Sequence, residues 1–401
     1  MSSTATTVIT TMIAVAAHAQ ISRSRRGTAD TGRGAGWSGT PPSCTAWLAE
    51  CPDVAITGTA QHQAWRHKTL PPVEQLRPDL WSIPVPIPHN PLRYVSVHAF
   101  AVPGGISLLD TGWESEEGWA ALTGGLAAIG ADVTDVRGVL ITHLHFDHLG
   151  LAARVRKASG AWVAMHPADA ELVVSWNARD GAAAVAAEIE FLVGLGAHRA
   201  DAVADVGPPE AMERFTRMAA PDRLLADGDL ADLPGWALRA VHTPGHTPGH
   251  LCFTEERTGL FFSGDHVLPR ISPHISTRAE GDDDPLRAFL SSLAAVRGRP
   301  ATEVLPAHEW RFTGLAERVD ELTDHHEQRL AELLAAIHAH PHSTPWDLAA
   351  HLTWSRPWSS YERRMRIFAV TETDAHLRLL ASRGLVVPSG TTVPTWTAAV
   401  R

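Results

Sequence analysis

The chain has 401 residues, of which 44% are hydrophobic, so it is long enough for two or three domains with sizeable cores. Its formal net charge of −10 at pH 7 argues against a protein that binds nucleic acid through a broad basic surface, although a local basic groove stays compatible with it. The three cysteines, Cys44, Cys51 and Cys252, are an odd set without zinc-site spacing, which argues against a disulfide framework and favours a reduced, cytoplasmic compartment.

Residues 1–74 are predicted to be a largely disordered leader. Residues 21–69 are rich in Gly, Ser, Thr and Arg and lack sustained periodicity, with room for short helices around Trp47 and Trp65. Ala17-His18-Ala19 resembles a cleavage site, but no Lys or Arg precedes the mildly apolar run before it, so secretion is the weaker alternative. No run reaches the ~18 apolar residues of a membrane span, and no membrane contact is expected.

Strands dominate the region that follows. Tyr94 to Val102 and Ile106 to Leu109 flank a Pro-Gly-Gly turn and predict a hairpin, after which strands alternate with helices. This order predicts an α/β (α+β) sandwich of two mixed sheets with helices outside. Residues 182–194 and 210–219 form a helical insertion that we expect to act as a lid, with Phe215 and Met218 either lining an apolar pocket or packing in the core.

A loop between the apolar run Val139-Leu140-Ile141 and the helical segment from Leu149 carries an unusual set of polar residues. It contains His143, His145, Asp147 and His148, which is more than a structural turn needs. His143 and His145 are two apart, so at a strand end their side chains project to the same side. Neutral imidazole suits zinc and its neighbours, and the carboxylate compensates charge, so the loop predicts a metal site.

Three further polar residues also follow apolar strands. His246 lies in a loop set by two Pro-Gly pairs, Asp265 follows Ser263-Gly264, and His308 follows Val304-Leu305. Each alone is as well explained by a hydrogen-bonded structural role. Their recurrence at strand ends predicts one shared site on one rim of the sandwich.

The chain resembles the metallo-β-lactamase superfamily from about residue 78 to 312. Its ordered motifs are present as Asp110, then His143-x-His145-x-Asp147-His148, then His246, Asp265 and His308. The resemblance implies an αββα sandwich with a two-metal centre between the sheet edges. It implies that one metal is held by His143, His145 and His246 and the other by Asp147, His148 and His308, with Asp265 as bridge. Asp110 would orient the His loop, since metal ligands need such support.

Departures from family patterns narrow the expectation. Zinc β-lactamases commonly have Cys where Asp265 stands, and flavodiiron-type relatives carry Glu where His145 stands, so drug hydrolysis and oxygen reduction are both disfavoured. The sequence Gly-His-Thr-Pro-Gly-His in the loop around His246 resembles the corresponding loops of the glyoxalase II, lactonase and thioesterase branches.

The character of the chain changes beyond Thr313. A helical stripe from Leu315 to Ile337, helices at 345–352 and 371–382 and a small hairpin predict a winged-helix-like domain, as in the lactamase-B2-like branch. The tight basic cluster is limited to Arg363, Arg364 and Arg366, so a packing or dimerisation role, with a homodimer possible, is favoured over nucleic-acid contact. The expected organisation is a leader (1–74), a catalytic domain (75–312) and this C-terminal domain (313–401).

The expected function is a hydrolase with two Zn²⁺ ions, Fe or Mn remaining open, that directs a metal-bridging hydroxide at a small ester-like substrate, with a thioester or lactone preferred. Asp147 is the candidate catalytic residue, because it could also relay a proton. The alternatives are a metal-dependent endoribonuclease, and a non-enzymatic nucleic-acid-binding regulator with a structural metal. Among the other histidines, His166, His250, His266 and His326 are expected to be structural, and His274 to line the pocket mouth.

Overall fold

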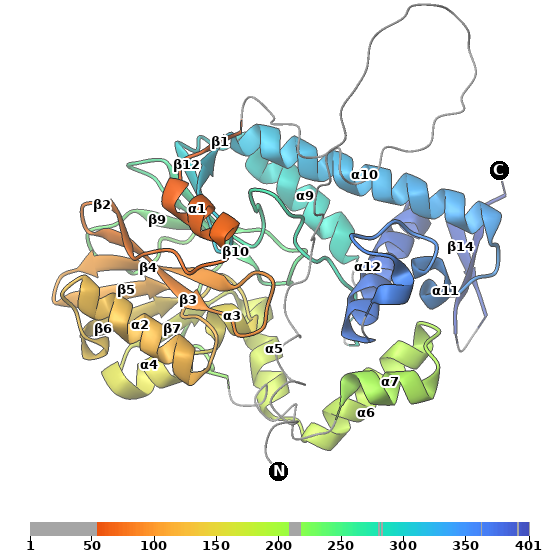
Figure 1. Ribbon diagram of the computed structural model, residues 1–401, viewed down its shortest axis with the longest axis horizontal. Helices are drawn as coiled ribbons and strands as arrows, with labels where there is room; N and C mark the ends of the chain where they lie inside the picture. The colour runs from red at the N-terminus through yellow and green to blue at the C-terminus, as the bar shows by residue number, and fades with distance from the viewer. Residues whose placement is uncertain are drawn as a thin grey trace, which may run out of the picture.

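The computed structural model describes residues 54–207, 218–279, 281, 284–361, 363–390 and 393–400. Two β-sheets pack face to face on one side of the molecule, and a group of helices from the C-terminal part lies on the other side (Figure 1). The expected helix at 210–219 lies outside the described residues, apart from its last two positions, which are not helical.

Within the described ranges, the first sheet has seven strands in the order β2-β3-β4-β5-β6-β7-β8. These strands are β2 (Glu74–Arg77), β3 (Leu80–Pro86), β4 (Tyr94–Val102), β5 (Gly105–Leu109), β6 (Val136–Leu140), β7 (Trp162–Met165) and β8 (Arg223–Leu224). Strands β2 to β5 pair antiparallel, and β5 to β8 pair parallel. The hairpin predicted around the Pro-Gly-Gly turn is β4–β5, and Gly104 supplies the positive φ (+81°) that the turn needs.

The second sheet is mixed as well, with six strands in the order β1-β13-β12-β11-β10-β9 over the same described part of the chain. Its strands are β1 (Ala55–Ile56), β9 (Leu238–His242), β10 (Leu251–Glu255), β11 (Leu260–Gly264), β12 (Glu303–Pro306) and β13 (Phe312–Thr313). Only β11 and β12 pair parallel. A core of fully buried side chains, with Phe100 and Leu140 from one sheet and Phe253 and Phe262 from the other, fills the space between the two sheets.

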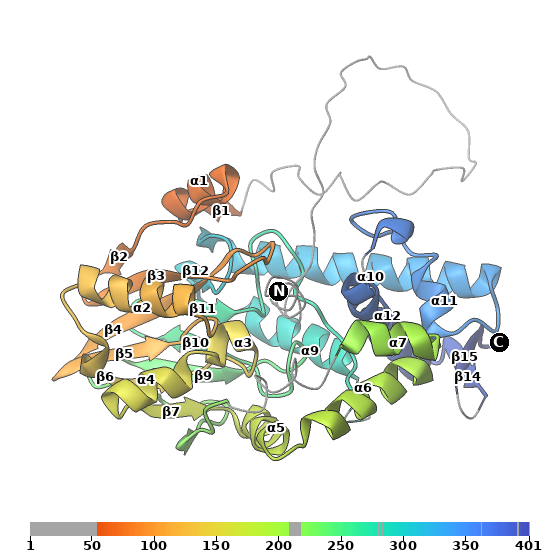
Figure 2. The same ribbon diagram turned by 60° about the horizontal axis from the view of Figure 1, so that its bottom comes forward.

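Helices cover the outer face of each sheet, which gives four layers (Figure 2). The first sheet is covered by α2 (Glu116–Ala128) and α4 (Ala152–Ser159), the second by α9 (Pro285–Arg297) and α10 (Leu315–Ala339). Helix α2 begins where Ser115 accepts a hydrogen bond from Gly118 N and buries Leu122 and Leu126 against the sheet. The predicted αββα sandwich is confirmed.

The C-terminal helices are followed by a small hairpin, in the predicted order. They are α10, α11 (Pro345–Ala349) and α12 (Arg363–Ser382), with the 3₁₀ turn η5 (Trp358–Ser360), and the hairpin is β14 (Val386–Ser389) with β15 (Thr395–Ala398). Their core is continuous with that under the second sheet, because buried residues of α9, α10, α12 and β14 belong to one cluster. Within the described residues, no helix is both long and apolar enough to cross a membrane.

The α6 and α7 part of the insertion after β7 packs against this C-terminal region, while α5 packs against the first sheet. It consists of α5 (Pro167–Asn177), α6 (Gly181–Gly194) and α7 (Arg199–Val206). Trp346 N donates to Leu195 O over 2.9 Å, and side chains of α6 and α7 share a cluster with Trp346 and Ile367. Met218 is buried in the core under the first sheet, which supports the packing alternative for this residue, while Phe215 lies outside the described residues.

Order begins earlier than the boundary at residue 74 that the sequence suggests. Strand β1 pairs with β13, and the helix expected around Trp65 is α1 (Thr59–His67). The Trp65 ring contacts the Trp310 ring edge-on, with ring centroids 5.2 Å apart. Thr57 N and Gly58 N both donate to Arg311 O. These partners are about 250 residues away in sequence, so local composition could not reveal them. Residues 1–53 lie outside the described residues.

Candidate metal centre

The expected site residues stand at strand ends of both sheets. Asp110 follows β5 directly, and the His-rich loop follows β6 and includes the short helix α3 (Phe146–Leu149). His246, Asp265 and His308 follow β9, β11 and β12 of the second sheet. The structure brings all seven candidate ligands together in two groups and in a third group, His143, His148 and Asp265, that overlaps both. In each group the donor atoms lie within 4.8 Å of one another.

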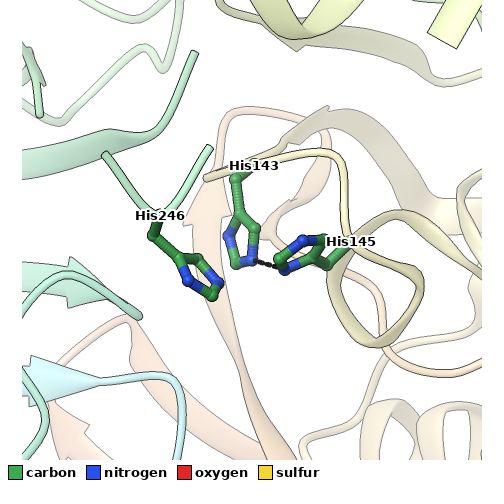
Figure 3. A group of neighbouring side chains, drawn as sticks. All are labelled: His143, His145 and His246. Carbon is green, nitrogen blue, oxygen red and sulfur yellow. Dashed lines mark hydrogen bonds between the residues drawn. The ribbon is translucent and has the colours of Figure 1, made fainter. Parts of the chain in front are cut away.

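The first group consists of His143, His145 and His246. His143 Nε2 lies 3.0 Å from His145 Nδ1, and the His246 ring stands edge-on to both rings, with centroids 4.8 and 4.5 Å away. Figure 3 shows the three imidazoles converging on one point, with His246 approaching from a different loop. Three converging nitrogens from imidazoles match the donor type that zinc prefers.

The second group consists of Asp147, His148 and His308, all fully buried. His308 Nε2 lies 3.3 Å from Asp147 Oδ2, and His148 Nε2 lies 3.8 Å from Asp147 Oδ1. This group therefore combines two imidazoles with one carboxylate, again a donor set for a transition-metal ion.

Asp265 stands between the two groups. Its Oδ1 lies 3.3 Å from His308 Nε2 and 3.5 Å from His148 Nε2, and its Oδ2 lies 3.5 Å from His246 Nε2. One carboxylate oxygen thus faces each group, which is the placement that a bridging ligand requires.

Most of the donor atoms at the centre lack ordinary hydrogen-bond partners within the described part of the chain. The buried atoms in this condition include Asp147 Oδ1 and Oδ2, His148 Nε2, His246 Nε2, Asp265 Oδ1 and His308 Nε2. Buried polar atoms without partners are costly, and their concentration at one point indicates a ligand that satisfies them together. The residues present fit bound metal.

The electrostatics favour positive charge at the same place. Burial lowers the pKa of His308, but the carboxylates of Asp265 and Asp147 outweigh burial and raise it well above its usual range. The same balance, with Asp110 as the largest carboxylate contribution, raises the pKa of His148 to about 8. Burial would raise the pKa of Asp265, yet His308 and His148 hold it well below its usual range. Cations bound here would supply this positive charge in place of protons.

Burial is the dominant influence on the pKa values of the first group and outweighs the opposing effect of the Asp265 carboxylate. It lowers the pKa of His143 and His145 well below the usual value, and the neighbouring imidazoles add to the shift. Both rings are therefore neutral at pH 7, which is the form that binds a metal.

Asp110 supports the second group from behind. It accepts hydrogen bonds from Thr142 N at 2.8 Å and from the Thr142 hydroxyl, and its Oδ2 lies 2.8 Å from His148 Nδ1. A carboxylate at Nδ1 keeps the proton there and leaves Nε2 free for a metal. Asp110 has a φ of +62°, a left-handed conformation that is uncommon outside glycine.

Sequence reasoning missed Asp169, which joins the two ligand loops. Its buried carboxylate accepts from Leu144 N (2.9 Å) in the first loop, and from the Thr247 hydroxyl (2.8 Å) and Gly249 N (2.6 Å) in the second. Burial raises its pKa to about 6 in spite of these bonds. The available signal was an Asp shortly after β7, at the start of α5, the same strand-end position as the other site residues.

The remaining histidines have structural contacts. His166 caps α5 and stacks on His242; His250 Nε2 accepts from Asp265 N, and its ring faces that of His266. His326 is buried against His376, as its place on the apolar stripe predicts. His274 packs against Phe368.

Comparison with known proteins identifies the family. Residues 91–308, more than half of the chain, match the family described as the metallo-beta-lactamase superfamily. The chain belongs to this superfamily. The matched range contains every candidate ligand, and the fold and the order of the motifs agree with the assignment.

Individual relatives extend the similarity beyond that range. The structure of a metallo-beta-lactamase family protein from Thermus thermophilus is 30% identical, covers 81% of this chain and all of that one, and superposes with a TM-score of 0.68. A probable metallo-hydrolase, YqjP of Bacillus subtilis, is 24% identical over 75% of this chain and 92% of its own length. An atrochrysone carboxyl ACP thioesterase of Aspergillus chevalieri is 30% identical, but over only 28% of this chain and 34% of its own. The chain spans about half or less of the first curated relatives that it matches, 53% and 32% of their lengths.

Proposed function

We propose that this superfamily member is a metal-dependent hydrolase with a binuclear centre that cleaves a thioester or lactone. The observation that carries the proposal is the pair of donor groups that share Asp265, with their unpaired atoms buried at one point. Structural zinc sites close with four ligands and rarely pair, so two adjoining groups favour a catalytic role.

The donor sets divide between two ions. His143, His145 and His246 would hold one ion, Asp147, His148 and His308 the other, and Asp265 would bridge them. Two zinc ions in such a site supply an activated water at neutral pH and polarise a carbonyl oxygen. Iron and manganese suit the same nitrogen and oxygen donors, so the metal is a matter for measurement.

Among the protein side chains, one is suited to proton transfer and another is unsuited to act as the nucleophile. Asp147 presents both carboxylate oxygens to the centre without a hydrogen-bond partner among the described residues, so one oxygen can bind metal while the other takes up a proton. Cys252 is not a suitable nucleophile, because burial raises the pKa of its thiol to about 12. Nucleophilic attack by water therefore fits the site better than attack by this cysteine.

The substrate class is proposed from two supports. The loop around His246 resembles the glyoxalase II, lactonase and thioesterase branches, and one relative is named as an acyl carrier protein thioesterase. The Asp at position 265, in place of the Cys common in zinc β-lactamases, disfavours β-lactam hydrolysis.

The test is a substrate panel assayed with metal-loaded protein of known metal content. Purified protein should carry close to two metal ions per chain and hydrolyse a thioester or a lactone, with little turnover of phosphodiesters or RNA. His246→Ala should lose hydrolysis together with the ion held by His143, His145 and His246. Retained turnover in His246→Ala would reject the mechanism, and turnover of RNA alone would favour the endoribonuclease alternative.

A further inference from the structure

The segment that leaves the metal centre after Asp265 lies against the C-terminal helices, and its residues 268–277 are called the strap below. Arg318 of α10 is buried and donates from Nε to Leu268 O over 2.7 Å and from Nη2 to Ile271 O over 3.0 Å. A planar guanidinium that donates to two carbonyls of one segment fixes both the place and the direction of that segment.

Ser272 joins the strap to both long helices through two buried histidines. His376 Nδ1 donates to Glu372 O over 2.8 Å within α12, which leaves Nε2 of the neutral ring as an acceptor. His326 Nδ1 lies 3.2 Å from that nitrogen, and Ser272 Oγ lies 3.1 Å from His326 Nε2. Burial lowers the pKa of His376 to about 3 and that of His326 well below its usual value, so both rings are neutral. The His326 ring then donates to His376, and His326 Nε2 is left as an acceptor that faces the Ser272 hydroxyl, which also lies 3.2 Å from Pro273 O.

His274 contacts the metal centre with its backbone and α12 with its side chain. Its carbonyl accepts from His246 Nδ1 over 2.8 Å, and its own Nε2 donates to Phe368 O over 3.0 Å. Its ring also stands edge-on against the Phe368 ring, with centroids 4.8 Å apart. Three residues further on, Thr277 N donates to Thr371 O of the same helix over 3.3 Å.

This support distinguishes His246 from three other candidate histidine ligands. The outer nitrogens of His143, His148 and His308 lie 2.8 to 3.0 Å from Asp110, Thr142 or Tyr94, which all belong to the sandwich. His246 instead relies on the strap. An imidazole that presents Nε2 to a metal carries its proton on Nδ1, and the acceptor of that proton sets the direction of the ring.

We propose that the C-terminal helices position one metal ligand: α10 and α12 hold the strap, and the His274 carbonyl of the strap orients His246. The inference rests on the proposed metal-dependent function but not on the choice of substrate. The C-terminal helices would then influence metal binding although they contribute no ligand themselves. Loosening the strap lowers the affinity for the ion held by His143, His145 and His246. The affinity for the ion held by Asp147, His148 and His308 stays the same.

The test uses two substitutions at one position in the full chain. His274→Phe keeps a flat ring against Phe368 but removes the donor to its carbonyl, and His274→Gln places an amide N–H near the position of Nε2. Metal-free protein is titrated with Co²⁺, followed by its visible spectrum, and with Zn²⁺ in competition with a chromogenic chelator. We expect His274→Phe to lower the affinity for one of the two ions about tenfold or more and to alter the Co²⁺ spectrum. The Gln variant should restore most of that affinity.

Reference variants identify the ion and control for folding. The ion weakened in His274→Phe should be the one lost in His246→Ala and kept in His308→Ala. Ser272→Ala, a milder change two residues before His274 in the strap, should lower the affinity for the same ion. His340→Phe repeats the substitution on an exposed ring near the end of α10, where it stacks on His351, and should bind both ions normally.

The outcomes separate the two proposals. If wild-type protein binds two ions, and His274→Phe and Ser272→Ala bind both as tightly, the positioning role is overturned while the hydrolase proposal stands. Equal weakening of both ions in His274→Phe, or no recovery in His274→Gln, also overturns it. If wild-type protein itself binds no metal, the proposed function fails first.

Discussion

Asp265 is the residue on which the two donor groups depend, because its two oxygens face different groups. Asp265→Asn keeps the shape of the side chain but removes the negative charge between the two proposed cations. We expect bound metal to fall from about two ions per chain to one or fewer, and kcat to fall at least a hundredfold, equivalent to about 2.7 kcal/mol of transition-state stabilisation. Metal analysis after gel filtration, combined with steady-state kinetics, measures both. Asp227→Asn, at an exposed acid that accepts a hydrogen bond from His242 N, is the matched control. Two ions retained in Asp265→Asn would exclude a bridging role.

His98 tests the electrostatics of the core away from the metal centre. It lies fully buried on β4 with its ring edge-on to Phe262, and burial, with a smaller contribution from Arg311, lowers its pKa to about 3. Between pH 6.5 and 3 the unfolded chain binds a proton at this residue and the folded chain does not. This group therefore does not lower the free energy of unfolding above about pH 6.5. Below that pH it lowers the free energy of unfolding by up to ~1.4 kcal/mol per pH unit.

Replacement by leucine should remove that dependence. We expect His98→Leu to unfold in urea with a stability that falls less steeply than wild type below pH 6.5, measured on metal-free protein in the presence of chelator. The difference between the two proteins should grow in favour of the variant at each lower pH. Parallel curves for the two proteins would show that His98 is not held neutral by burial.

Asp169 connects three parts of the fold. It belongs to helix α5, which lies on the first sheet, and its carboxylate accepts hydrogen bonds from both ligand loops. Asp169→Ala leaves Leu144 N and Gly249 N without their acceptor in a buried place, which should cost about 2–4 kcal/mol of unfolding free energy. The loops carrying His145 and His246 should also move relative to one another, and metal affinity should fall about tenfold. Urea unfolding and chelator competition measure the two effects. Glu171→Ala, at an exposed position on the same helix, should change neither. Unchanged metal affinity in Asp169→Ala would mean that the loops hold their positions without it.

The elements differ in how far their sequence revealed them. Strands such as β6 and β12 end in short apolar runs that stand within three residues of a histidine, a pattern that marks a buried strand end without any knowledge of the fold. Helix α1 has no such pattern, and its order depends on Trp310 and Arg311 from the far end of the domain. Asp169 is a single acid whose partners lie 25 to 80 residues away, so only the folded chain shows its role.

The arrangement of whole regions was the least predictable feature. The apolar run that forms α6 predicts a helix, but its docking on the C-terminal region depends on contacts such as that of Gly196 with Thr344. A Cβ at Gly196 would lie 2.4 Å from Thr344 Oγ1, and Gly196 has a φ of +99°, so glycine permits the close approach twice over. Periodicity describes which face of a helix is buried and does not say against what.

The candidate metal centre draws its donor residues from both sheets. His143, Asp147 and His148 follow a strand of the first sheet, while His246, Asp265 and His308 follow strands of the second. Ions that bind all of these side chains bind the folded chain and not the unfolded one, so they stabilise it by RT ln(1 + [metal]/Kd), about 2.7 kcal/mol at a free concentration a hundred times Kd. We therefore expect chelation to lower the melting temperature, and the midpoint to rise with free Zn²⁺ until solubility limits it. His308→Ala, which loses a ligand from the second sheet, should show a smaller rise in calorimetry at matched free Zn²⁺. A midpoint independent of Zn²⁺ in the wild type would mean that the sheets are held together without the ions, and the proposed coupling of metal binding to folding would be rejected.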